Sequence, residues 1–333
     1  MTTTVTPRVR PRRTEAMEDK KEESVKPQGD TTEGAPQETP SSEEDTKQAK
    51  PKWNLQIEDL TDVEELLKML FYGPPGVGKT VLAASAKDVV ALSPVLLVDF
   101  EGGTRSIQDR KGIRFVRIKT YQDILELLKM LRDPEILGYF KTIIIDPVNE
   151  MQKIVMNYII REAVANDPTH DKEIPYQQDW NRNSERMRRV IRILRDLPLN
   201  VIFTALAKEV KDETDGSIKY KPALPGQMAD EVSAYLDVVG FMQTGMVSIA
   251  GGDGKKKRAV IRRILFQSSG KFVSKDRTWM LGTVVNAPTM DKIYSLMQGQ
   301  KPVEEDDETE ETTNEEKSGE EPPETPEGEL SNG

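Results

Sequence analysis

The chain has 333 residues, with no cysteine, a single histidine (His170) and a formal net charge of −10. The lack of cysteine excludes disulfides and cysteine-based zinc sites, while one histidine, which we expect in an exposed loop, argues against His-based metal sites and Ser-His-Asp catalysis. No apolar run is long enough to span a membrane and no apolar signal core follows the N-terminus, so we expect a cytosolic protein.

The two ends of the chain differ in composition from the middle. Residues 1–51 are rich in Thr, Pro, Glu and Lys and have no aromatic residue, and residues 302–333 hold 14 acidic residues against one lysine. Segments so poor in apolar residues cannot offset their chain entropy by burial, so we expect two disordered tails. We expect residues 52–301 to form the folded domain. Its net charge of about +5 is compatible with a nucleic-acid partner.

Apolar runs and helical periodicities alternate through the first two thirds of this domain. Such alternation predicts an α/β fold with a mostly parallel central sheet flanked by helices, and a ligand site beyond the carboxyl ends of its strands. The predicted strands are 66–72, 95–98, 112–118, 141–146 and 200–206, and the predicted helices are 81–92, 121–131, 148–165 and a basic helix within 174–196.

The pattern changes after Lys208. Residues 208–221 are polar and contain Asp215-Gly216, a pair typical of hairpin turns. Residues 237–249 and 258–266 have the pattern of strands, and residues 290–297 that of a short helix. We therefore expect an antiparallel C-terminal extension of the sheet.

Residues 73–80, with the sequence GPPGVGKT, match the phosphate-loop motif G-x-x-x-x-G-K-S/T in full. They lie between a predicted strand and a predicted helix, so backbone N–H groups and the helix N-terminus can converge on a polyphosphate. The Lys79 ammonium is then placed to reach the β- and γ-phosphates of ATP, and the Thr80 hydroxyl to bind Mg²⁺. The predicted nucleotide contacts are Gly73, Pro74, Pro75, Gly76, Val77, Gly78, Lys79, Thr80 and Val81.

Two acidic residues complete the predicted site. Asp146 ends an apolar strand, where a second Mg²⁺ ligand is expected, although a strand-terminal acid can also cap the next helix. The residue after it is Pro147, so a water-activating base must come from another position. Glu101 ends the strand after the phosphate-loop helix and is our candidate for orienting or deprotonating the attacking water. The alternative for Glu101 is a solvated loop acid.

The order of GPPGVGKT, VLLVDFEGG, TIIIDPV and VIFTAL resembles the RecA superfamily of recombinases and ring helicases. More narrowly, the chain is similar to phage-encoded RecA-like nucleotide-binding proteins, some of which anneal single strands. The resemblance spans residues 66–297 and implies a RecA-like P-loop NTPase fold, with Glu101 in the place of the catalytic glutamate. Thr204 or Lys208 would take the place of the γ-phosphate sensor.

This resemblance implies an ATP-hydrolysing, Mg²⁺-dependent protein of phage-type DNA metabolism. It would bind single-stranded DNA and promote annealing or recombination as a homo-oligomer, either ring or filament. The alternative is a P-loop NTPase acting as a ring helicase, a helicase loader or a nucleotide-gated assembly factor. Lys275 and Arg277 resemble the Lys-x-Arg element that reaches a neighbour's γ-phosphate in hexameric RecA-like motors; otherwise they are a pair of surface cations.

Several segments are candidates for the DNA contact. The resemblance points to residues 166–176 and 208–221, the second of which offers Tyr220 for base stacking. The strongest positive cluster is 255–258, and the acidic C-terminal tail could compete with DNA for it or recruit a partner. Further cations, which could equally be a solvated face, follow the predicted basic helix at Arg182, Arg186, Arg188, Arg189, Arg192 and Arg195.

Overall fold

The computed structural model describes residues 66–211, 216–250 and 256–300, and it describes side chains except at 212–215 and 247–258 within this span. The predicted tails, 1–51 and 302–333, and the predicted turn residue Asp215 lie outside the described residues. All described residues belong to one compact unit, Thr61–Gly333.

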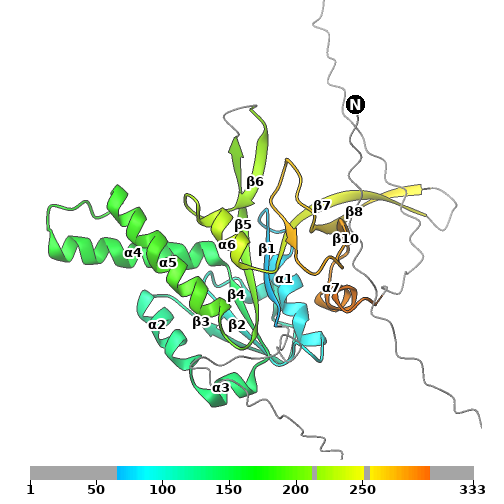
Figure 1. The fold of residues 1–333 in the computed structure, drawn as a ribbon, viewed down its shortest axis with the longest axis horizontal. Helices are drawn as coiled ribbons and strands as arrows, with labels where there is room; N and C mark the ends of the chain where they lie inside the picture. The colour runs from blue at the N-terminus through cyan, green and yellow to red at the C-terminus, as the bar shows by residue number, and fades with distance from the viewer. Residues whose placement is uncertain (1–65, 212–215, 251–255, 301–333) are drawn as a thin grey trace, which may run out of the picture. The chain divides into compact units, whose positions relative to one another are not determined.

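The described strands form one mixed sheet in the order β10-β8-β7-β1-β5-β4-β2-β3 (Figure 1). From β7 to β3 every neighbouring pair is parallel, whereas β8 and β10 add antiparallel strands beyond β7. The predicted α/β fold, with its mostly parallel sheet and antiparallel C-terminal extension, is confirmed. The strands are β1 (Lys68–Gly73), β2 (Val95–Asp99), β3 (Ile113–Arg117), β4 (Thr142–Asp146), β5 (Asn200–Lys211), β6 (Ile218–Pro222), β7 (Val238–Ala250), β8 (Lys256–Leu265), β9 (Lys275–Asp276) and β10 (Val284–Asn286).

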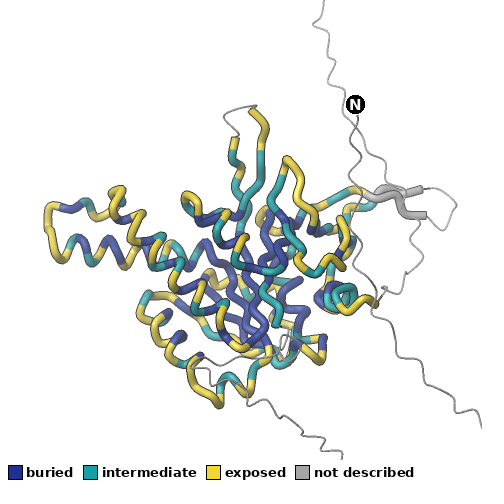
Figure 2. Tube along the Cα trace, viewed as in Figure 1, coloured by how far each residue is buried: buried dark blue, intermediate teal, exposed yellow. Residues whose placement is uncertain are grey.

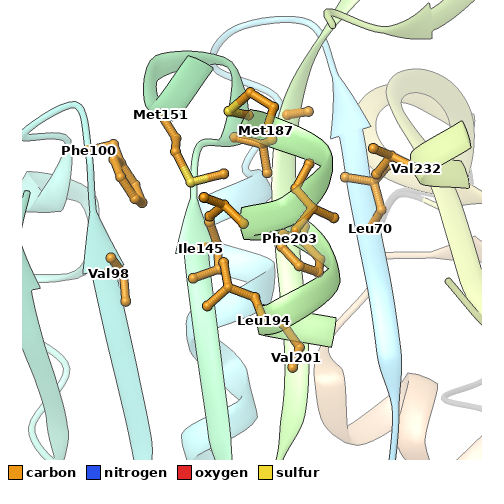
Figure 3. Close-up of a cluster of buried hydrophobic side chains, with 14 of the residues drawn as sticks. Leu70, Val98, Phe100, Ile145, Met151, Met187, Leu194, Val201, Phe203 and Val232 are labelled. Atoms are coloured by element: carbon orange, nitrogen blue, oxygen red, sulfur yellow. The ribbon is translucent and has the colours of Figure 1, made fainter. Parts of the chain in front are cut away.

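Helices cover both faces of the sheet, because its central strands are apolar on both sides. On β4, Ile143 and Ile145 pack in one buried cluster with α2, α4, α5 and α6, while Ile144 packs in a second cluster with α1 and α7. Figure 3 shows the first cluster, with Phe203 of β5 among the side chains beneath α5. The helices are α1 (Lys79–Ala84), α2 (Tyr121–Met130), α3 (Pro134–Tyr139), α4 (Val148–Asn166), α5 (Gln177–Arg195), α6 (Met228–Tyr235) and α7 (Met290–Met297).

Burial follows this layering. In Figure 2 the central strands are dark blue, whereas the far ends of α4 and α5 and of the β5–β6 hairpin are mostly yellow or teal. None of the described helices is both long and apolar enough to cross a membrane. Local sequence fixes the start of α2 through a capping box. The Thr120 side chain accepts a hydrogen bond from the Asp123 backbone N–H, and the Asp123 carboxylate accepts one from the Thr120 backbone N–H.

The predicted helix 81–92 is wrong in length. α1 ends at Ala84 and a 3-10 turn follows over Ser85–Asp88. The Ser85 hydroxyl donates to the Leu82 carbonyl and accepts from the Met290 backbone N–H at 2.8 Å, so a contact with α7 fixes this turn. Val89 then adopts an extended conformation, in line with the weak helix propensity of β-branched residues.

The strand predicted at 200–206 is longer than expected. β5 continues to Lys211 because its second half pairs with β6 in an antiparallel hairpin. The hairpin predicted for 208–221 is confirmed in its two strands. The sequence reading missed the short helices α3 and α6, whose apolar periodicity is brief.

Candidate phosphate-binding site

The phosphate loop, residues 73–80, follows β1 at the carboxyl edge of the sheet, and β4 ends at the same edge with β5 between them. Gly73 is required here, because a Cβ at this position would lie 2.3 Å from the backbone carbonyl oxygen of Met242 on β7. Gly78 is in the left-handed region, with φ of 100°. The two glycines let the loop turn tightly against the neighbouring strand and begin α1 at Lys79.

Lys79 is folded onto the phosphate loop. Its Nζ donates to the carbonyl oxygens of Gly73 (3.0 Å) and Pro74 (2.8 Å), and its side chain is largely buried. Burial lowers the pKa of the Lys79 ammonium, while the charges of Asp146 and Glu101 oppose that shift. The structure thus brings the predicted cation and both predicted acids into one electrostatic neighbourhood.

Asp146, at the end of β4, joins two hydroxyl groups from different elements. The Thr80 Oγ1 donates to its Oδ2 at 2.8 Å, and the Thr204 Oγ1, on β5, donates to its Oδ1. Burial raises the pKa of the Asp146 carboxyl, and the two hydrogen bonds counter this. Thr204 is fully buried, so it holds the Asp146 carboxylate in position in this structure.

Glu101 follows the neighbouring strand, β2, whose Asp99 lies opposite Asp146 in the parallel ladder. The Glu101 side chain is exposed. Its backbone is fixed by Asp99, whose Oδ1 accepts from the N–H groups of Glu101 (3.1 Å) and Gly102 (2.7 Å). Arg117 on β3 holds the other oxygen of Asp99. The buried Asp99 therefore sets the chain direction at Glu101, a role that the sequence reading did not assign.

An arginine from the C-terminal extension lies against the loop. A Cβ built on Gly78 would be 2.9 Å from the Nε of Arg262 and 3.1 Å from its Cδ. Arg262 is on β8, and the sequence reading missed it because strand pairing, which the spacing of residues does not reveal, brings it to the loop.

Lys275 and Arg277 lie at the other end of the sheet from the phosphate loop of their own chain. β9 pairs with the beginning of β7 at Val238 and Val239, and that part of β7 pairs with the beginning of β1. The Lys275 Nζ donates to the carbonyl oxygens of Ala234 (2.9 Å) and Leu236 (2.7 Å) at the end of α6. The Arg277 guanidinium pairs with Asp237 at 2.9 Å. Both cations thus stabilise the C-terminal end of a helix within the chain.

The segments expected to contact DNA have structural partners. The Tyr220 ring stacks on Phe241, with centroids 5.4 Å apart, so one face of this ring is already covered. Lys208, the second sensor candidate, donates to the Leu224 carbonyl. On α5, Arg186 and Arg188 pair with Glu162 and Glu231. The side chains of the cluster 255–258 lie outside the described residues.

The expectation of an exposed His170 is wrong. His170 is 5% exposed and closes the connection between α4 and α5. Its Nε2 lies 2.9 Å from the Asp179 Oδ2, its Nδ1 lies 2.6 Å from the Asp171 carbonyl oxygen, and its ring packs on Tyr176. The segment 166–176 is therefore the closed tip of a helical hairpin.

No curated protein matches the sequence. Among the solved structures that match, one described as the RadB recombinase has 15% sequence identity and a TM-score of 0.34, over 58% of this chain and 86% of that one; a likeness at this level assigns no function. The family described as AAA domain (AAA_24) matches residues 65–278, which is more than half of the chain and includes the phosphate loop, Glu101 and Asp146. The chain therefore belongs to this AAA domain family.

Proposed function

We propose that the chain is a Mg²⁺-dependent ATPase. The observation that carries this proposal is the 2.8 Å hydrogen bond between Thr80 of the phosphate loop and Asp146 of β4. Two side chains remote in sequence present hard oxygen atoms at the helix N-terminus where a polyphosphate binds, which suits a cation that prefers oxygen ligands. Bound Mg²⁺ would neutralise charge on the phosphate oxygens.

The chain's own residues supply the other parts of the reaction. Lys79, which donates to two loop carbonyls in this structure, exchanges them for β- and γ-phosphate oxygens when ATP binds. Glu101 projects from the adjacent strand end, where its carboxylate orients the attacking water and accepts its proton. Asp99 keeps Glu101 in place through the two backbone N–H groups that it holds.

We further propose single-stranded DNA as the client, as the resemblance to RecA-like proteins implies. A groove of about 390 Å³ between α2, α4 and α5 supports this choice. The rings of Tyr121 and Tyr158 lie 4.5 Å apart in it, with the Arg186 guanidinium 5.4 and 5.0 Å from their centroids. Lys129, Arg132 and Arg189 also line it, without a side-chain bond to any described residue. Cations that track a backbone beside aromatic rings suit a single strand.

The ATPase rate, measured with and without single-stranded DNA over a series of protein concentrations, tests both proposals. Lys79→Ala serves as the inactive control. We expect turnover that rises with DNA and with protein concentration, as an annealing or recombination protein acting as an oligomer requires. A rate that depends on protein concentration but not on DNA would favour a nucleotide-gated assembly factor. Separation of a forked duplex would favour a helicase.

The groove has its own test. Removing Lys129, Arg132 and Arg189 together by substitution with Gln should weaken DNA binding and flatten its salt dependence. The matched control replaces Lys111, Arg114 and Lys271, which are also without a side-chain bond to a described residue and lie outside the groove. If both triple variants lost the same amount of DNA affinity, the effect would reflect non-specific attraction between positive charge and DNA. This result would contradict the groove as the DNA site.

A further inference from the structure

The pairing of three strands places Arg262 beside the phosphate loop. β1 leads into the loop and pairs with β7, and β7 pairs with β8 so that Thr244 lies opposite Arg262. The Arg262 carbonyl accepts a hydrogen bond from the Ala287 N–H at 2.9 Å, which joins β8 to the residue that follows β10. The backbone of Arg262 is therefore held on both sides, and its side chain reaches Gly78 from a fixed base.

The guanidinium of Arg262 has no charge partner in the described part of the chain. It forms no hydrogen bond or ion pair with a described residue, and its Cζ would lie 3.4 Å from a Cβ built on Gly78. The loop already holds one cation, the Lys79 ammonium, whose charge is opposed by those of Asp146 and Glu101. Arg262 adds an exposed cation that pairs with no described acid, and the anion that fits a phosphate loop is a polyphosphate.

We infer that Arg262 binds the phosphates of the nucleotide from β8, within the same chain as the phosphate loop. This inference rests on the proposed function, since it deepens the same nucleotide site. It assigns the positive charge at the loop to Lys79 and Arg262 of one subunit. Arg277 lies at the opposite end of the sheet, so it could contact only the nucleotide of a neighbouring subunit, or else serve to stabilise α6. A bound polyphosphate would also bridge α1 and β8, so the antiparallel extension would respond to nucleotide.

Binding of inorganic tripolyphosphate and of ATP to the full chain tests the inference, with calorimetry as the readout. Tripolyphosphate has no base, so it isolates the phosphate contact. The variants are Arg262→Gln, Arg262→Lys, which keeps the charge without the planar fork, and Arg263→Gln as control. The Arg263 side chain points to the other face of β8, where it reaches the Met246 carbonyl. Thermal unfolding of each variant verifies that it is folded.

We expect Arg262→Gln to bind both ligands roughly tenfold to a hundredfold more weakly, which is the loss expected for one charge-assisted contact. Arg262→Lys should lie between this variant and the unmodified chain, and Arg263→Gln should match the unmodified chain. If Arg262→Gln binds both ligands normally, the inference fails while the nucleotide site stands. If it loses ATP but keeps tripolyphosphate, the guanidinium contacts the base, which also overturns the inference. If the unmodified chain binds neither ligand, the proposed function itself fails.

Discussion

The hydroxyl of Thr80 donates a 2.8 Å hydrogen bond to the carboxylate of Asp146, although the two residues are 66 positions apart. This bond joins the first turn of α1 to the end of β4 across the intervening strand β5. It places the two predicted Mg²⁺ ligands side by side. Burial of the Asp146 carboxylate outweighs the hydrogen bonds from Thr204 and Thr80 and the nearby charge of Lys79, so its negative charge is costly to the folded protein.

Asp146→Asn should therefore stabilise the nucleotide-free protein while removing Mg²⁺-dependent turnover. The substitution keeps the shape and relieves the burial of a charge, so we expect the Tm to rise by roughly 2–5 °C at pH 7. Differential scanning calorimetry and an ATPase assay measure the two effects. A lower Tm with turnover intact would contradict this role of Asp146.

The pH dependence of that stabilisation follows from the raised pKa of Asp146. Below the unfolded-state pKa of 3.8 the carboxyl is neutral in both states and costs nothing. As the pH rises from there to the folded-state pKa, the unfolded state loses its proton first, so the folded state becomes relatively less stable. The Tm difference between Asp146→Asn and the unmodified chain should grow through this window and then level off. A constant difference from pH 3 to 7 would contradict it.

Asp99→Asn tests the positioning of Glu101. The substitution weakens the acceptor for the Glu101 and Gly102 N–H groups and removes the charge partner of Arg117. We expect kcat to fall about tenfold or more because the water-orienting carboxylate is displaced, while ATP affinity changes little. Asp109→Asn, an exposed acid nearby without a described side-chain bond, is the control. Equal kcat values in the two variants would show that Asp99 does not position the site.

The sequence predicted those parts of the site that lie within one continuous segment. The phosphate loop and the acids at the ends of β2 and β4 follow from local pattern, because parallel strands align their carboxyl ends. Arg262 could not be found in this way, since its place depends on the register of β7 and β8. His170 was misjudged for a related reason: its partner Asp179 lies in the next helix, and a polar loop residue gives no sign of burial. Asp99 ends β2, one residue beyond the predicted strand 95–98, and its role depends on Arg117, which comes from β3.

The tip of the α4–α5 hairpin should loosen as the pH rises. Both ring nitrogens of His170 lie at hydrogen-bond distance from oxygen atoms. The hydrogen bond to the Asp171 carbonyl, and after it the one to Asp179, raise the pKa of the imidazole, although burial opposes this shift. The stabilisation is complete below the unfolded pKa of 6.5 and is lost as the pH rises through the higher folded value. Amide hydrogen exchange at residues 167–176, corrected for intrinsic rates, measures it. His170→Gln should lack this pH dependence; an identical profile in both proteins would refute the role of the imidazolium.

Lys275 and Arg277 can be separated by stability and by subunit mixing. Lys275→Met should cost about 1 kcal/mol of folding free energy, because α6 loses a cation on its last carbonyl groups. Arg277→Ala should fail in turnover alone and recover when mixed with Glu101→Gln, if Arg277 acts on a neighbour's nucleotide as the resemblance implies. Without recovery, its role is limited to the ion pair with Asp237.

ATP turnover by Glu101→Gln, compared with the unmodified chain in Mg²⁺, tests the central claim most directly. We predict that the unmodified chain hydrolyses ATP. Glu101→Gln should bind ATP with similar affinity, but its turnover should be slower by a factor of about 100 or more. Glu135→Gln, which removes an exposed carboxylate from α3, should retain full turnover. An unmodified chain that shows no Mg²⁺-dependent hydrolysis, or a Glu101→Gln variant that hydrolyses ATP at the normal rate, would contradict the account.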